Sequence, residues 1–229
     1  MYKNVKLLSK DDKNLKVNAI KGFKYASQLT QCIITVDEFF KASKSQPIVF
    51  SKNEAGEYFA STLLGLEKDT NNFVNGKGEW SKAEYVPAYV RRYPFIFVQD
   101  KETLALAYDG DCKEINEKKG QEFFDEEGNA TEYITNVMKF MESFQKSSVV
   151  TASFIKELDE LGLLEDAKAD MSVDGKKFAF TGFKRVNEEK LNALSEEQTL
   201  KLIKNGSYKL IVAHLISMSN FEKLVSLQK

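Results

Sequence analysis

The spacing of apolar residues changes along the chain. In the first hundred residues, short runs alternate apolar and polar positions, whereas beyond residue 130 apolar positions recur every three or four residues. A period of two is typical of half-buried strands, and the longer spacing is typical of a helix with one buried face. We therefore predict the α+β class, with an antiparallel β meander in the N-terminal half packed with C-terminal helices.

Turn residues divide the first half into candidate strands. Asn75-Gly76 predicts a hairpin with a type I′ turn, in which both central residues have positive φ. A second hairpin, at 171–186, is predicted to turn at Asp174-Gly175. The other predicted strands are 32–36, 46–50, 57–67, 94–99 and 103–108, the last two joined by a tight connection at 100–102.

Helix signals dominate the second half. An amphipathic pattern begins at Thr131, and Gly162 is its natural C-terminal stop. Small and β-branched residues at 146–151 predict a kink or a break within it. The remaining signals are Asp37 as an N-cap, Asn187 as another, Ser195 with Gln198 as a capping box, and a last helix from near Ser207.

The chain contains no internal repeat, no low-complexity tract and no linker rich in Pro, Gly or Ser. We therefore expect one α+β domain over residues 1–229. A subdivision near residue 128 is the alternative.

Composition and charge restrict the possible partners. A hydrophobic content of 42% in 229 residues is ample for a core, and the net charge of −1 gives no basic field for nucleic acid. Charge is uneven, because 1–52 contains ten Lys against four acidic residues and 99–170 contains eighteen acidic residues against eight Lys. This asymmetry indicates either two solvated faces or an acidic docking surface.

The sequence also indicates a compartment. The N-terminal residues lack the apolar run of a secretory signal, and no apolar run is long enough to predict a membrane span. Cys32 and Cys112 are most simply interpreted as free thiols of a reducing compartment. We expect a cytoplasmic protein without a membrane span, and the sequence does not define its oligomeric state.

Familiar catalytic motifs are absent, and no cofactor or metal is predicted. The single histidine, His214, excludes a two-histidine iron site and the usual zinc sites within one chain. It lies in the apolar stripe of the last predicted helix. It is therefore either a buried structural imidazole or a general base, and it is the candidate catalytic residue.

The turn formed by Asp125, Glu126 and Glu127 is strongly acidic. It lacks the alternating ligand spacing of an EF-hand loop, so we interpret it as a solvated turn rather than a cation site.

Arg91 and Arg92 are adjacent in a chain whose basic residues are otherwise nearly all lysine. Such a pair indicates a need for the planar, bidentate guanidinium group. If the segment is extended, the two side chains point to opposite faces. Either one forms an internal ion pair while the other lies at the surface, or one contacts a carboxylate or phosphate ligand. The candidate ligand-binding set also includes Tyr85, Tyr89, Tyr93 and Arg185.

The block "YVPAYVRRYPF" at 85–95 resembles the SapC family of bacterial proteins, named for a gene associated with surface-layer protein loci. Lys13-Asn14 departs from the family, whose members often have a basic residue and a histidine there, so no role of that histidine transfers. The resemblance implies surface-layer biogenesis but no known reaction or ligand. The resemblance to the family extends to further segments of the chain: 47–50, 63–66, 124–128, 160–165, 182–194 and 213–224.

Two functional hypotheses follow. A cytoplasmic accessory protein that binds a protein or peptide partner in surface-layer or envelope protein production agrees with the resemblance and with the acidic 99–170 segment. The alternative is a small-molecule or peptide-modifying enzyme, in which Arg91 or Arg92 binds an anion and His214 transfers a proton. A structural component of the layer itself is disfavoured by the missing secretory signal.

Overall fold

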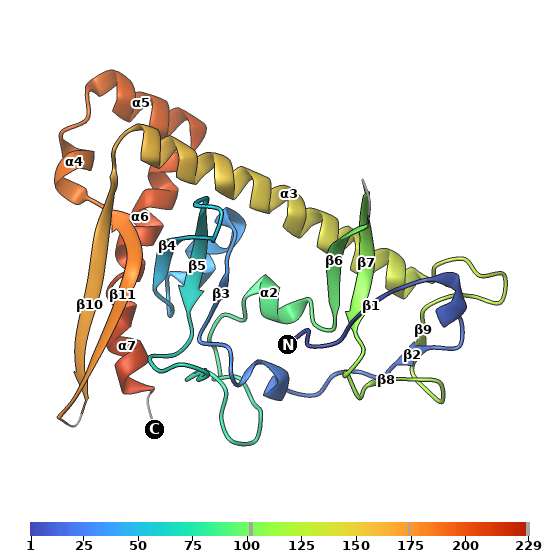
Figure 1. Cartoon of the computed structure of the whole chain (residues 1–229). Coiled ribbons are helices and arrows are strands. Elements are labelled where there is room, and N and C mark those ends of the chain that lie inside the picture. Colours follow the sequence, from blue (N-terminus) through green and yellow to red (C-terminus); the bar gives the residue numbers. More distant parts are fainter. Residues whose placement is uncertain (101–102, 174, 228–229) are drawn as a thin grey trace. The chain divides into compact units, whose positions relative to one another are not determined.

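The structure, a computed structural model, describes residues 1–100, 103–173 and 175–227. The chain divides into two compact units: unit 1 is Met1–Gly22 with Tyr89–Lys146, and unit 2 is Phe23–Ala88 with Ser147–Lys229. Each unit combines antiparallel strands with helical segments, which confirms the predicted α+β class (Figure 1).

Unit 1 contains two three-stranded sheets, in the orders β1-β7-β6 and β8-β2-β9. Its strands are β1 (Val5–Leu7), β2 (Lys16–Val17), β6 (Phe95–Asp100), β7 (Thr103–Asp109), β8 (Ile115–Asn116) and β9 (Gln121–Glu122), with a 3-10 helix at Lys10–Asp12. The β6–β7 hairpin confirms the strands predicted at 94–99 and 103–108. Residues 101 and 102 of its connection lie outside the described residues.

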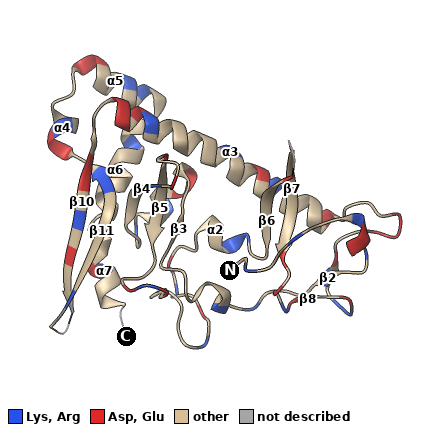
Figure 2. Cartoon of the chain, viewed as in Figure 1, with Lys and Arg blue, Asp and Glu red and all other residues tan. Residues whose placement is uncertain are grey.

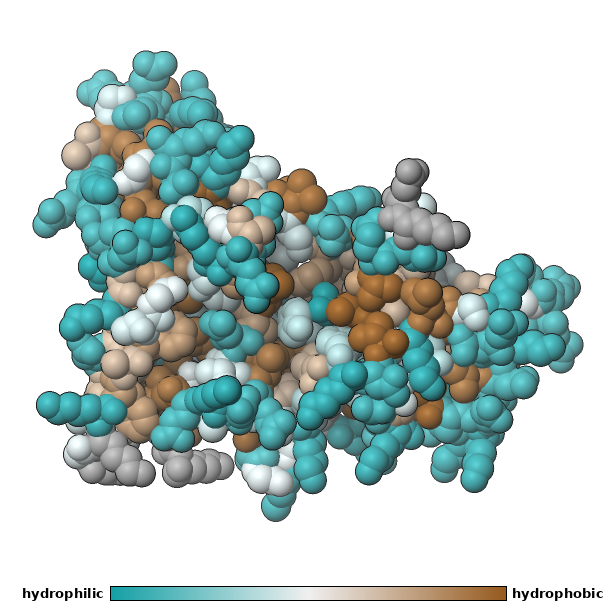
Figure 3. Space-filling model, viewed as in Figure 1, coloured by the Kyte–Doolittle hydropathy of each residue, from teal (hydrophilic) through white to brown (hydrophobic). Residues whose placement is uncertain are grey.

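One face of the β1-β7-β6 sheet forms the core of unit 1. Phe95 stands opposite Tyr108 on this face, and both pack with Phe123 and with Met141 of helix α3 (Glu132–Glu160). The register places Val5 and Leu7 on the opposite face. Val5 and Leu7 are 44% and 49% exposed, and Figure 3 shows hydrophobic surface gathered over these strands.

Unit 2 is built on one five-stranded sheet in the order β10-β11-β4-β5-β3. Its strands are β3 (Gln31–Ile33), β4 (Ile48–Lys52), β5 (Tyr58–Leu63), β10 (Leu164–Val173) and β11 (Lys176–Val186). The β10–β11 hairpin confirms the hairpin predicted at 171–186. Strands β4 and β5, which pair with each other, overlap the strands predicted at 46–50 and 57–67. Asp174, in the second turn, lies outside the described residues.

Short helices cover this sheet. Helix α6 packs on β4 and β11, and α7 packs on β10 (Figure 1). The helical segments of unit 2 are η2 (Lys24–Ala26), η3 (Val36–Glu38), α1 (Phe39–Ala42), α4 (Glu188–Asn192), α5 (Glu196–Asn205), α6 (Ser207–Ser217) and α7 (Asn220–Ser226), with the second part of α3. Buried side chains from the sheet, α3 and α6, including Phe50, Leu158 and Ile211, form the core.

A kink or a break was predicted at 146–151. Helix α3 runs from Glu132 to Glu160 without interruption, so a break there is wrong. The hydroxyl of Thr151 donates to the carbonyl of Ser147, one turn earlier in the helix (2.7 Å), so this hydroxyl has a hydrogen-bond acceptor within the helix. β-Branched residues lower helix propensity only slightly, and packing overrides such a preference. The stop at Gly162 is confirmed, since Gly162 has φ +66° and the Leu163 N–H closes on the Leu158 carbonyl.

The predictions of helix caps are partly confirmed. Asn187 caps α4, and Ser195 forms a capping box with Gln198 at α5, as predicted. The prediction of Asp37 as an N-cap is wrong, because Thr35 takes this position in a capping box with Glu38. The last predicted helix is two helices, α6 and α7.

Three loops share one geometry: 53–57, 75–79 and 125–129. In each, the side-chain oxygen of the first residue accepts the N–H of the fifth, and the fourth residue is a glycine with positive φ. In each loop the side chains of the first and fifth residues also form a hydrogen bond from an amide to a carboxylate. The amide comes first, as Asn before Glu, in two loops, and the carboxylate comes first, as Asp125 before Asn129, in the third. The type I′ turn predicted at Asn75-Gly76 is wrong, because the positive φ belongs to Gly78.

Candidate functional site

The segment around Arg91 and Arg92 is not extended. Ala88–Arg91 forms a helical turn, α2, directly after Pro87. Proline suits this place, because its φ is compatible with a helix and its missing N–H would have had no intrahelical partner. The prediction that the two arginines point to opposite faces of a strand is therefore wrong.

Arg92 lies among aromatic rings of unit 1. Its guanidinium carbon is 4.1 Å from the centre of the Tyr89 ring, 5.2 Å from that of Phe144 and 5.5 Å from that of Tyr2. Its Nε is buried without a hydrogen-bond partner, and no carboxylate of the described residues forms an ion pair with it. Ring faces therefore hold this cation, and part of its hydrogen-bonding capacity is unused. Arg91 is exposed, with its guanidinium 5.5 Å from the Phe140 ring.

Tyr2 connects this cluster to Tyr93. The N–H of Tyr2 donates to Asp109 (2.8 Å), its hydroxyl donates to the Phe95 carbonyl (2.9 Å), and its ring centre is 5.7 Å from that of Tyr93. The Tyr93 hydroxyl hydrogen-bonds to Asp109 and Cys112, and burial, followed by these two groups, raises its pKa well above the usual value. Burial also raises the pKa of the Cys112 thiol. Because the thiolate is the nucleophile, Cys112 is poorly suited to covalent catalysis.

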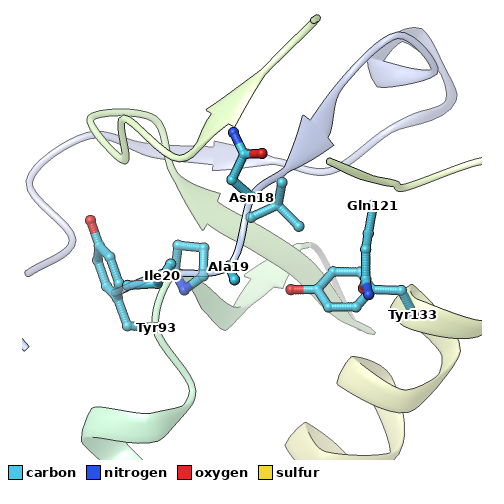
Figure 4. A pocket seen from close by; sticks show the side chains of 8 residues that line it. Asn18, Ala19, Ile20, Tyr93, Gln121 and Tyr133 are labelled. Atoms are coloured by element: carbon cyan, nitrogen blue, oxygen red, sulfur yellow. The ribbon is translucent and has the colours of Figure 1, made fainter. Parts of the chain in front are cut away.

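A pocket of about 310 Å³ opens beside Tyr93. Figure 4 shows the Tyr133 hydroxyl pointing across it toward Ala19, while the Tyr93 hydroxyl points away. Burial, followed by the nearby Cys112, raises the pKa of Tyr133 to about 12, so this hydroxyl is a neutral donor. We call this hollow the tyrosine pocket; its lining is Val17, Asn18, Ala19, Ile20, Tyr93, Pro94, Gln121 and Tyr133.

The tyrosine pocket has no charged lining residue. Within the part of the chain that the structure describes, the side chains of Asn18, Gln121 and Tyr133 have no hydrogen-bond partner. Val17, Ile20 and Pro94 supply apolar surface. The pocket thus offers two amides and a hydroxyl, none of which is hydrogen-bonded within the described part of the protein, to an uncharged ligand.

Two further hollows follow along unit 1. One, of about 650 Å³, shares Gln121 and Tyr133 with the tyrosine pocket and adds Glu122, Thr131, Glu132 and Asn136. The other, of about 470 Å³, shares Glu122 with it and is lined also by Lys13, Asn14, Lys16, Glu117, Phe124, Asp125 and Glu126.

The acidic turn predicted from the sequence borders the last hollow. The Asp125 carboxylate accepts the backbone N–H groups of Asn129 and Glu127, and these hydrogen bonds, chiefly that from Asn129, hold its pKa below the usual value. Glu127 contacts the Asn129 amide (3.2 Å). Asp125 therefore organises the turn. No cluster of His, Cys, Asp and Glu among the described residues is arranged to hold a metal ion.

Tyr85 and Arg185 belong to unit 2, where each has partners of its own. The Tyr85 hydroxyl donates to Glu38 (2.8 Å), whose buried carboxylate also accepts from the Ala88 N–H (2.7 Å) and from the N–H and hydroxyl of Thr35. Arg185 pairs with Glu165 at 2.8 Å. These contacts support anchoring roles for both residues within unit 2.

His214 is fully buried in unit 2, where its ring packs 4.7 Å from that of Phe50. Its Nε2 accepts the Val186 N–H (3.0 Å), and its Nδ1 lies 2.9 Å from the Ile48 carbonyl and donates to it. Burial lowers its pKa to about 4. Both ring nitrogens thus join backbone groups of adjacent strands, which favours the structural interpretation over proton transfer.

Sequence reasoning missed Tyr2, Asn18, Gln121 and Tyr133. They come from four separate stretches, so no local spacing links them. Tyr133 was visible only as an aromatic residue beside the apolar face of α3. No motif marked Asn18, which lies between Val17 and Ala19.

The fold and the site define an α+β protein with an uncharged pocket lined by aliphatic, amide and tyrosine side chains. No described helix is long and apolar enough to cross a membrane. The SapC family model matches residues 7–224, and the chain belongs to the SapC family, as the resemblance predicted. Neither a curated protein nor a solved structure matches the chain.

Proposed function

We propose that the protein is a cytoplasmic accessory factor that binds an uncharged, extended peptide segment of a protein partner. The observation that supports this most is the tyrosine pocket, in which Asn18, Gln121 and Tyr133 place hydrogen-bonding groups beside the apolar side chains of the lining. The partner belongs to surface-layer or envelope protein production. That assignment rests on the family resemblance, and the compartment rests on the sequence.

The chemistry of the pocket matches a peptide. The side-chain amides of Asn18 and Gln121 each donate and accept, as the backbone of an extended peptide does. Tyrosine rings supply large contact areas at low cost in conformational entropy. A phosphate or carboxylate would lose its hydration there without meeting a cation, which is unfavourable.

Site-specific photo-crosslinking in cells tests this proposal. A photoreactive phenylalanine analogue replaces Gln121, and mass spectrometry identifies the crosslinked peptide segment. The matched control places the same analogue at Glu142, an exposed position on α3 that lines none of the three hollows.

One uncharged partner segment, crosslinked from 121 but not from 142 and lost with Tyr133→Ala, is the expected result. Tyr133→Phe, which removes only the hydroxyl, should weaken the crosslink less. Identical products from both positions would refute the proposal.

Arg92 favours a second candidate, the anion-binding enzyme. Its buried Nε without a partner is a donor that a carboxylate or phosphate would satisfy. A thermal-shift screen of wild type and Arg92→Lys against carboxylates, phosphates and nucleotides tests it. A ligand at about one hundred times its Kd stabilises by about 2.7 kcal/mol. A stabilising anion whose effect is lost in the variant would support this candidate, and a flat screen would count against it.

A further inference from the structure

Strand β1 is an open edge of the β1-β7-β6 sheet, because it pairs with β7 on one side only. The N–H of Leu8 donates to the Leu106 carbonyl, which fixes the phase of the antiparallel ladder. Only every second residue bonds to the neighbouring strand in such a ladder, so the N–H and C=O groups of Val5 and Leu7 point away from β7. Within the described part of the chain, these four backbone groups have no hydrogen-bond partner.

The same two residues present apolar side chains to solvent. Val5 and Leu7 are exposed on the face opposite the core of unit 1, and the half-buried Ile96 and Val98 of β6 share that face. Figures 2 and 3 show this part of the sheet as a largely uncharged, hydrophobic surface. An added strand would therefore meet free backbone groups and apolar side chains at the same place.

Two other sheet edges are protected. On β6, at the other edge of the same sheet, the outward carbonyl of Phe95 accepts the Tyr2 hydroxyl (2.9 Å). On β10, at an edge of the sheet of unit 2, exposed charges alternate along the strand at Asp166, Lys168 and Asp170. Capping groups and charges of this kind discourage strand addition. The outward positions of β1 have neither.

We infer that β1 accepts an extended strand of a protein partner in antiparallel orientation, with apolar residues on either side of an acidic residue that lies opposite Lys6. Main-chain hydrogen bonds to Val5 and Leu7 supply affinity in this mode of recognition, and the alternating side chains supply specificity. This surface is separate from the tyrosine pocket, so the inference adds a second interaction site to the proposed function.

Lys6 determines the charge of the partner strand. It is exposed, and no acidic side chain of the described residues forms an ion pair with it. Because Val5 and Leu7 would form the hydrogen-bonded pairs, Lys6 takes the closely spaced position between them, where opposite charges attract and like charges repel. A second copy of the chain is a poor occupant, because pairing Val5 of each copy with Leu7 of the other sets two Lys6 side chains opposite each other.

Selection from a random dodecapeptide display library against the full chain supplies the probes. Enriched peptides should contain an acidic residue between two apolar ones, and a copy with Lys in place of the acidic residue should bind more weakly by fluorescence polarisation. The amide hydrogens of Val5 and Leu7 should exchange more slowly when the peptide is bound, because both gain acceptors.

Proline tests the backbone contacts. Val5→Pro removes an outward N–H and no ladder bond, so it should weaken peptide binding by about three- to tenfold. Ile33→Pro is the matched control on β3, where the bond from Ile34 to the Ala60 carbonyl shows that the N–H of Ile33 also points away from its neighbouring strand. The control should leave binding unchanged, and circular dichroism checks that both variants are folded.

Side-chain variants test the rest. Lys6→Glu should weaken binding of the acidic peptide and strengthen that of its Lys copy, each by about two- to fivefold at low salt. Leu7→Ser keeps the backbone and should weaken both.

The remaining outcomes would overturn the inference. Peptides that depend on Tyr133 but are insensitive to Val5→Pro and Leu7→Ser would belong to the tyrosine pocket, and would leave the proposed function standing. An empty selection, or enriched peptides without an acidic residue, would count against β1 as described. Protection of the Val5 and Leu7 amides that rises with protein concentration, without peptide, would show that a second copy occupies the edge.

Discussion

The buried histidine predicts a specific loss of stability in mild acid. The pKa of His214 is lowered from 6.5 to about 4 in the folded protein, so the unfolded chain binds the proton more tightly. The stability that the neutral imidazole provides is therefore complete above the unfolded pKa and is lost as pH falls toward the folded pKa. From these two values, the free energy of unfolding should fall by about 2 kcal/mol between about pH 7 and about pH 5.

Replacing the histidine isolates this effect from every carboxylate. His214 is the single histidine of the chain, and His214→Gln keeps all acidic residues. The variant should be less stable at neutral pH by about 1–3 kcal/mol, because the Val186 N–H loses its well-placed acceptor. The difference between wild type and variant should then shrink by about 2 kcal/mol on going to about pH 5.

Urea unfolding followed by tryptophan fluorescence measures these quantities. Trp80 is the single tryptophan of the chain, is buried, and belongs to unit 2 together with His214. Its emission therefore reports on the unit that contains the histidine. If wild type and variant lost stability in parallel between the two pH values, His214 would not be a buried neutral group, and the structural assignment would fail.

Three further predictions concern stability. Glu38→Gln should lower the free energy of unfolding by about 2–3 kcal/mol, because an amide nitrogen replaces a buried acceptor; a loss under about 0.5 kcal/mol in urea unfolding would contradict this. Gly128→Ala should cost about 1 kcal/mol from its positive φ alone, and Gly120→Ala should cost more by circular-dichroism melting, because its Cβ would also collide with the Val17 carbonyl; equal losses would count against that contact. Arg92→Met should change stability by less than about 1 kcal/mol, because lost ring contacts offset the relief of a buried, unpaired Nε; a calorimetric loss of several kcal/mol would mean that the guanidinium has a strong partner.

The structural features that could be predicted are those determined by residues close together in the sequence. Asn187, Ser195 and Gly162 fix helix ends through hydrogen bonds to backbone groups a few residues away, so their identity and spacing suffice. Thr35 and Glu38 have the same spacing as Ser195 and Gln198, so the capping box at η3 was also visible.

The site was less predictable, because it depends on contacts between distant segments. Arg92 was selected for its chemistry, yet its surroundings are set by Tyr2 and Phe144, which lie far from it in sequence. The tyrosine pocket joins residues near 18, 93, 121 and 133 in the same way. Periodicity indicates which face of an element is buried, and it does not indicate which polar residues of separate elements meet.

The three matching loops bear on how the protein ages chemically. Asn followed by Gly is the sequence most prone to deamidation, and Asn75 precedes Gly76 in the loop at 75–79. In the aspartate product of this reaction the oxygen that organises the loop is retained, just as a carboxylate oxygen organises the loop at Asp125. The fifth residue, however, is Glu79, so the new carboxylate would face another where an amide now donates. The loop at 125–129 has the reversed order, with an aspartate first and Asn129 fifth, so its first position has no amide to lose and the amide at its fifth position donates to the aspartate.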